Sequence, residues 1–137
     1  MKKYKQIIFL LLIFCLAFAV RLYKIDNPIA DWHSWRQADT ASVTRNFIKQ
    51  GFTPLFPKFD SVVSLNQYAD QNPDRFFFAE FPIYNILVYP LYKHFGVNVI
   101  YHRLVSVLFS SLTIFSLFFL TKIFSSTFTA YTASLIF

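Results

Sequence analysis

The sequence predicts an all-α membrane protein, and three observations support this fold class. Of its 137 residues 55% are hydrophobic and 21% are aromatic, whereas 15% are charged, against roughly 25% charged residues in an ordinary soluble domain. Two runs without a charged residue, 7–20 and 104–121, approach the roughly 20 residues that a helix needs to cross a bilayer. Lys2, Lys3 and Lys5 precede the first run, and basic residues favour the cytoplasmic side of a membrane helix.

The first apolar run is expected to form a transmembrane helix that, with a cytoplasmic tail, occupies residues 1–23. Its basic start and the small residues of Ala17-Phe18-Ala19 also fit a cleaved signal peptide. Retention as a membrane anchor is favoured, because Arg21 and Tyr23 continue as an interfacial flank and further apolar runs follow.

Residues 24–99 are predicted to form an external loop. A cytoplasmic N-terminus means that the first span leads out of the cell and the second span returns. All seven acidic residues fall between Asp26 and Glu80, with basic residues among them, so the loop is nearly neutral. The net charge of +6 is therefore scattered beside apolar runs. This distribution argues for a lipid bilayer as partner and against a nucleic acid.

A first loop helix is predicted near residues 35–50. Ser34 and Gln37 fit a capping box, with Ser34 as N-cap, and Gly51 supplies a stop. The helical wheel places an apolar side and a polar side on this segment. The apolar side is expected to comprise Thr40, Ala41, Thr44, Phe47 and Ile48, and the polar side Asp39, Ser42, Asn46 and Lys49.

A second loop helix is predicted near residues 82–95. Pro82 suits the first helical position, and Gly96 marks the end. Its tyrosines and helically spaced apolar residues are typical of a helix that lies in the headgroup layer. Glu80 precedes this helix, so its carboxylate is expected at a positive helix end.

The second span is expected at residues 100–123, and residues 127–137 resemble the start of a third. From Phe128 only ten residues follow to Phe137, counting both. Since ten residues reach only about half of a 30 Å hydrocarbon core, we expect the chain to be the N-terminal portion of a larger polytopic protein. Four basic or titratable residues surround the start of the second span and are expected to reach toward lipid headgroups. They are Lys93, His94, His102 and Arg103.

Four short motifs appear in a characteristic order. The first loop helix carries WRQADTASVTRNFIKQG from Trp35, EFP begins at Glu80, FGVN begins at Phe95, and RLVSVLFSSLT begins at Arg103. In this order and spacing the chain resembles the GT-C membrane glycosyltransferases. The closest branch contains the protein O-mannosyltransferases and the lipid A aminoarabinose transferase, which is the glycosyltransferase family 39-like branch.

The resemblance implies an N-terminal fragment of a GT-C-type helical fold that moves a sugar from a polyprenyl-phosphate donor. The acceptor would be a lipid, glycan or protein on the outer face of the membrane. Such a transfer needs a carboxylate to accept the acceptor's proton and a positive group for the departing phosphate. Asp39 and Arg36 supply these two charges. The order of acid and base in Arg36-Gln37-Ala38-Asp39 is reversed relative to the family's Asp-Glu-x-Arg, so Asp31 is the substitute candidate for the base.

The remaining candidates concern phosphate and metal binding. Phe81 stands where the family often has a lysine, and Arg75 is the candidate that would replace this phosphate contact. The resemblance gives Glu80 a metal-binding or phosphate-side role, and His33 is a candidate to join a divalent metal site.

A structural interpretation competes with each functional one. Asp39 would then be a first-turn residue favoured by the helix dipole and paired with Arg36, and Glu80 a carboxylate at the start of a helix. In the corresponding alternative function the chain is a non-catalytic membrane protein, or a gene remnant, that acts as an assembly partner. The fragment alone is expected to be inactive, because a lipid-linked donor cavity needs more spans.

Overall fold

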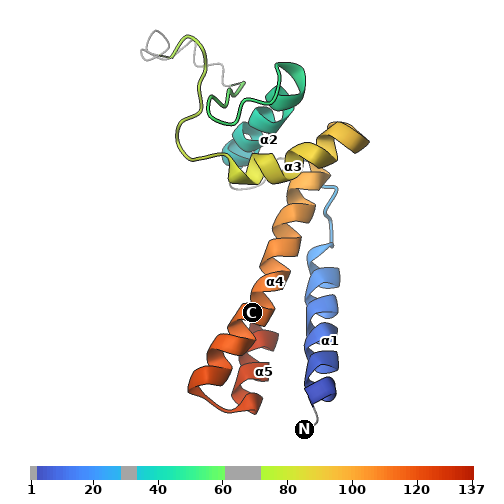
Figure 1. Ribbon diagram of the computed structural model, residues 1–137. Coiled ribbons are helices and arrows are strands. Elements are labelled where there is room, and N and C mark those ends of the chain that lie inside the picture. The colour runs from blue at the N-terminus through green and yellow to red at the C-terminus, as the bar shows by residue number, and fades with distance from the viewer. Residues whose placement is uncertain (1–2, 29–33, 61–71) are drawn as a thin grey trace. The chain divides into compact units, whose positions relative to one another are not determined.

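The computed structural model describes residues 3–28, 34–60 and 72–137. These residues form five α-helices (Figure 1), and the prediction of an all-helical chain is confirmed for them. Between the helices, Lys58 and Phe76 form one isolated antiparallel bridge. The helices are α1 (Lys3–Arg21), α2 (Ser34–Lys49), α3 (Ile83–Phe95), α4 (Ile100–Phe124) and α5 (Thr127–Ile136).

The chain divides into two compact units. The first comprises residues 1–25 and 103–137, and it holds α1, most of α4, and α5. The second comprises residues 26–102, with α2, α3 and the segments that join them, and it ends within the first turn of α4.

Two helices are long and apolar enough to cross a membrane. The segments are Tyr4–Arg21, with a mean hydropathy of 1.9, and Ile100–Phe124, with a mean hydropathy of 2.1. Only 11% and 22% of these windows are buried within the chain. Large apolar side chains such as Leu12 and Phe119 are therefore exposed, at 61% and 58%. A core helix of a soluble protein would bury most of that surface, so the coarse prediction of membrane helices has support.

In the first unit α1 and α4 run in opposite directions. Lys122 Nζ, near the end of α4, donates to Gln6 Oε1 near the start of α1, at 3.3 Å. Arg103 Nη1, near the start of α4, donates to the Ile25 carbonyl oxygen just beyond α1, at 2.8 Å. Contacts near both ends therefore identify an antiparallel course of α1 and α4.

The last helix, α5, folds back along α4. Ser126 caps it, because its hydroxyl accepts from the Thr129 backbone N–H at 3.2 Å. Ala130 is fully buried against Leu10 of α1 and Phe118 of α4. The apolar segment predicted at 127–137 is thus a helix that closes a small three-helix core.

The second unit is built on the packing of α2 against α3. Its buried apolar residues are Ala41, Val43, Phe47, Val88 and Tyr92. Both predicted helices exist, and each ends before a glycine in the left-handed region, at φ +104° for Gly51 and φ +87° for Gly96. The predicted starts are each displaced by one residue, a usual uncertainty of helix ends. Ser34 is the first residue of α2 rather than its N-cap, and Pro82 is the N-cap of α3 rather than its first residue.

The predicted division of α2 into a covered apolar side and an exposed polar side is confirmed for Ala41, Thr44 and Phe47, which are buried, but is wrong for three other residues. Ser42 and Asn46 are buried, at 3% and 4% exposure, whereas Ile48 is 36% exposed. The connection after α2 folds back over the polar side, where Asn46 Nδ2 donates to the Lys58 carbonyl oxygen at 3.0 Å. The covering segment brings backbone groups that need hydrogen-bond partners, so polar side chains of α2 become buried with it.

Candidate functional site

The candidate site lies on the first half of α2, where it meets α3. Three contacts between α2 and α3, including the residue just before α3, follow each other in the same order along both helices. Glu80, just before α3, meets Arg36; Asn85 meets Thr40 and Thr44; and the ring of Tyr89 meets that of Phe47. The two helices therefore lie alongside each other in the same sense, and their N-terminal ends come together.

An ion pair joins two of the residues predicted from the sequence. Arg36 Nη2 lies 2.8 Å from Glu80 Oε2, and the side chains are 60% and 47% exposed. The structural interpretation had paired Arg36 with Asp39, but the structure gives it Glu80 as partner. A pair this exposed contributes little stability, at most about 1 kcal/mol. Its importance is positional, because it brings the EFP motif to the first turn of α2.

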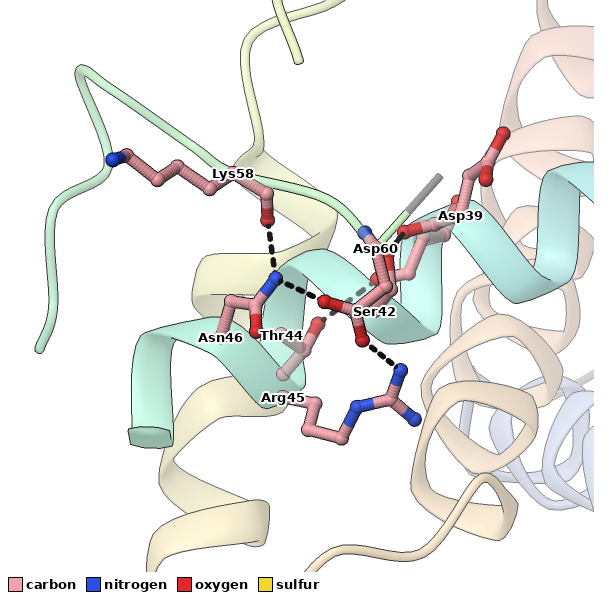
Figure 2. A network of polar contacts seen from close by, with 8 residues as sticks. Asp39, Ser42, Thr44, Arg45, Asn46, Lys58 and Asp60 are labelled. Atoms are coloured by element: carbon pink, nitrogen blue, oxygen red, sulfur yellow. Dashed lines mark hydrogen bonds and ion pairs between the residues drawn. The ribbon is translucent and has the colours of Figure 1, made fainter. Parts of the chain in front are cut away.

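Asp39 follows Arg36 by one helical turn and is partly buried. Burial raises the pKa of its carboxyl above the ordinary value of 3.8. The Asp39 backbone carbonyl accepts a hydrogen bond from Ser42 Oγ at 2.7 Å, while the carboxylate points away from the neighbouring polar network (Figure 2). A carboxylate that is partly desolvated and still accessible is a better proton acceptor than one in water.

A second acidic residue, Asp60, is anchored to the same helix (Figure 2). Its carboxylate accepts from Asn46 Nδ2 at 2.9 Å and forms an ion pair with Arg45. Although burial alone would raise the pKa of Asp60, the hydrogen bonds from Arg45 and Asn46 and the charges of Arg45 and Lys49 hold it below its ordinary value. Asp60 is thus a structural carboxylate, in contrast to Asp39. No signal in the sequence pointed to this network, because its members meet only through the fold of the connection.

A buried polar cluster in the second unit centres on His102, which is 6% exposed. Its Nε2 lies 2.9 Å from Thr44 Oγ1, and its Nδ1 lies 3.1 Å from Tyr92 Oη. Asn85 Nδ2 donates to Thr44 Oγ1 at 2.8 Å and to the Thr40 carbonyl oxygen at 2.6 Å. His102 therefore does not reach toward headgroups, as its position beside the second span had suggested. The sequence does not reveal this role, because a histidine beside an apolar run can lie either at a membrane surface or in a buried polar cluster.

Burial also affects the tyrosine of this cluster. The desolvation of the Tyr92 hydroxyl, which outweighs the opposing charge of Arg45, raises its pKa to about 12. Tyr92 therefore stays protonated across the physiological range and acts as a neutral hydrogen-bonding group.

The described residues do not assemble a metal site. No three His, Cys, Asp or Glu side chains gather among residues 3–28, 34–60 and 72–137 in a way that could hold an ion. Glu80, one of the two predicted metal ligands, has Arg36 as its partner. The other, His33, lies outside the described residues, as does Asp31, the substitute base. Among the described residues the polar partner of Glu80 is therefore a cation, and metal binding by Glu80 and His33 stays a prediction.

Arg75, the second predicted phosphate ligand, occupies a turn. Its φ of +56° lies in the left-handed region. Its backbone N–H donates to the Asn72 carbonyl oxygen at 3.1 Å, and its own carbonyl accepts from the Phe59 N–H at 3.0 Å. The Arg75 side chain is exposed. The structure thus assigns a backbone role to this residue, and phosphate binding by its side chain stays a prediction.

Comparison with known proteins adds no relative to this picture. No protein-family model matches the chain, and neither a curated protein nor a solved structure is detectably similar to it.

Proposed function

We propose that this chain is part of an integral membrane glycosyltransferase of GT-C type. The enzyme would transfer a sugar from a polyprenyl-phosphate donor to a lipid, glycan or protein acceptor on the outer face of the cell membrane. In this proposal α1 and α4 cross the membrane, the N-terminus is cytoplasmic, and residues 24–99 lie outside. The antiparallel course of α1 and α4 supports a path that leaves the cytoplasm and returns.

The observation that carries the proposal is the ion pair between Arg36 and Glu80. The resemblance rests on two motifs that are 44 residues apart in the chain. A shared active site requires such motifs to meet, and the ion pair brings them into contact. Their contact leaves Asp39 one turn away, with a carboxylate whose pKa is raised by burial.

The residues can be given roles in a balanced transfer step. The acceptor hydroxyl oxygen attacks the anomeric carbon of the sugar, and the bond from that carbon to the phosphate oxygen breaks. The hydroxyl proton passes to the Asp39 carboxylate, and the polyprenyl phosphate leaves with the bonding electrons. Arg36 stabilises the charge that develops on the phosphate, and for this it exchanges its exposed bond to Glu80 for one to the leaving group.

The test measures sugar transfer by the complete gene product in proteoliposomes. The donors are undecaprenyl phosphates that carry radiolabelled mannose or 4-amino-4-deoxyarabinose, and the acceptors are lipid A and a serine-rich peptide. Release of undecaprenyl phosphate is followed together with label transfer. Asp39→Asn is expected to reduce transfer by at least about 100-fold, within the range of general-base catalysis. Asp60→Asn is the matched control, because it also removes an aspartate next to α2 and should retain transfer per folded molecule.

Each outcome of this test has one interpretation. Retained transfer in Asp39→Asn removes Asp39 from the role of base. Equal losses in Asp39→Asn and Asp60→Asn would mean that both act through the fold of the loop. Failure of the wild-type protein to release undecaprenyl phosphate from either donor would refute the enzyme and leave the alternative function, an assembly partner in the membrane.

The proposed orientation is tested with the single native cysteine removed. In a Cys15→Ser background, a cysteine at Asn98 should react with a membrane-impermeant maleimide in intact cells, and a cysteine at Ser125 should react only after lysis. The reverse pattern would contradict a cytoplasmic N-terminus.

A further inference from the structure

We propose that His102 is a positioning residue for the candidate site: through Thr44 it fixes the α2 helix, and with it the placement of Asp39 and Arg36. The inference rests on the proposed function, and it gives a role to a histidine outside the predicted site. His102 lies in the first turn of α4, whereas Asp39 and Arg36 lie on α2. All of them belong to the same compact unit.

The connection from His102 to the site is continuous. His102 Nε2 contacts Thr44 Oγ1 at 2.9 Å, and Thr44 Oγ1 lies 3.4 Å from the Thr40 carbonyl oxygen one turn earlier. Thr40 Oγ1 in turn donates to the Arg36 carbonyl oxygen at 2.8 Å. The residues 36, 40 and 44 thus form one line along α2, and His102 holds its buried end.

The proton arrangement of the cluster follows from counting its donors. Asn85 already donates to Thr44 Oγ1 and to the Thr40 carbonyl oxygen. If Thr44 donated to Nε2, the His102 proton would sit on Nδ1 and point at Tyr92 Oη, and the buried Tyr92 hydrogen would have no acceptor among the described residues. With the proton on Nε2, His102 donates to Thr44, Tyr92 donates to Nδ1, and Thr44 donates to the Thr40 carbonyl oxygen.

This Nε2–H tautomer uses every donor of the cluster, which buried polar groups require. It also gives the two ring nitrogens different tasks. Nε2 holds α2 through Thr44, and Nδ1 holds α3 through Tyr92. Loss of the Nε2 bond should therefore displace α2 selectively.

The two nitrogens can be tested separately with amide side chains. In His102→Gln the longer carboxamide can place an N–H near the position of Nε2, whereas in His102→Asn the shorter carboxamide reaches only the position of Nδ1. Thr44→Val removes the hydroxyl with little change of shape. His94→Asn is the matched control, because His94 is an exposed histidine in the last turn of α3.

The activity measurement uses the full gene product with undecaprenyl phosphate mannose or 4-amino-4-deoxyarabinose as donor, corrected for the folded fraction. We expect His102→Asn and Thr44→Val each to lower kcat about 10- to 100-fold with KM within about twofold, since displacement of about 1 Å can cost a factor of 100. Their double variant should be no worse than either single variant. His102→Gln should recover most of kcat, and His94→Asn should match the wild type.

A second measurement does not depend on activity. In detergent micelles, the 15N shifts of the His102 ring should be those of a neutral Nε2–H imidazole, and the backbone amide shifts of residues 36–44 should move in His102→Asn but not in His94→Asn. A protonated Nδ1, or an unmoved α2, would overturn the proposal even if transfer is observed. Unchanged kcat in His102→Asn and Thr44→Val, or additive losses in their double variant, would overturn it too. If the wild type transfers no sugar but the NMR result is as expected, the proposed function fails and the positioning of α2 by His102 stands.

Discussion

Replacing Asn85 by alanine should weaken the contact between α2 and α3 more than its single side chain suggests. Asn85 is 4% exposed, and its amide nitrogen donates to the Thr40 carbonyl oxygen at 2.6 Å and to Thr44 Oγ1 at 2.8 Å. Each such bond contributes about 0.5–1.5 kcal/mol net. Truncation to alanine also leaves space in a packed interface, which adds to the loss. The total is about 2–3 kcal/mol.

Hydrogen exchange of the α2 and α3 amides, measured by mass spectrometry in detergent, reports this local stability directly. Since about 1.36 kcal/mol corresponds to a factor of ten, Asn85→Ala should lower protection in both helices about 30- to 150-fold. Asn85→Asp should lower it further, because an ionised carboxylate cannot donate and would face the Thr40 carbonyl oxygen. Leu87→Ala, at a neighbouring position of α3 that is 42% exposed, should change protection by less than about fivefold.

The reasoning would be refuted by either of two results. Protection in Asn85→Asp equal to that of the wild type would mean that the amide does not donate to α2. Equal losses in Asn85→Ala and Leu87→Ala would mean that α3 stabilises α2 through general apolar contact and that the buried hydrogen bonds contribute nothing specific.

Three further predictions use the same exchange assay. Phe47→Ala should lower the local free energy of unfolding by about 3–5 kcal/mol, because Phe47 is only 2% exposed. Ile48→Ala should lower it by about 1 kcal/mol or less, because Ile48 is 36% exposed, and similar losses in the two variants would contradict the observed burial. The pKa of Asp60 is lowered in the fold, so its stabilisation exists above its ordinary pKa of 3.8 and is lost as the pH falls through the folded-state value. Protection in wild type and Asp60→Asn should therefore differ at pH 7 and converge only as the pH falls through that folded-state pKa, below 3.8. The pKa of Asp39 is raised by burial, so its charge costs stability at neutral pH, and this cost disappears as the pH falls below the ordinary pKa. Asp39→Asn should therefore increase the protection of α2 at pH 7. A decrease in protection would instead favour a stabilising structural role for Asp39.

The sequence determined where the helices lie and where α2 and α3 end. Charge-free runs of sufficient length predicted α1 and α4, because about 20 predominantly apolar residues suffice for a helix that crosses a bilayer. Gly51 and Gly96 predicted the ends of α2 and α3, because each adopts a positive φ that other residues rarely tolerate. The length of an apolar run and the backbone conformation of a glycine depend on neighbouring residues, so the sequence is enough to predict them.

The sequence also selected Arg36 and Glu80 through the order of motifs, but it could not show that they touch. Their contact depends on how α3 lies along α2. The structure gave Arg36 this partner instead of Asp39, and it left Asp39 partly buried with its carboxylate directed away from the polar network around Asp60. The pKa of each acid depends on its surroundings in the fold. The sequence therefore could not predict that the pKa of Asp39 is raised and that of Asp60 is lowered.

Only the tertiary structure decided which polar residues are buried. Ser42 and Asn46 fell on the exposed side of the helical wheel, yet the segment after α2 covers them. His102 was read as a membrane-flanking residue, yet it joins α2 and α3 from the first turn of α4. Helical periodicity records which residues share a face but not what will cover that face. Burial of a polar group depends on whether a partner from a distant part of the chain can satisfy its hydrogen bonds, and that partner is fixed only when the chain has folded.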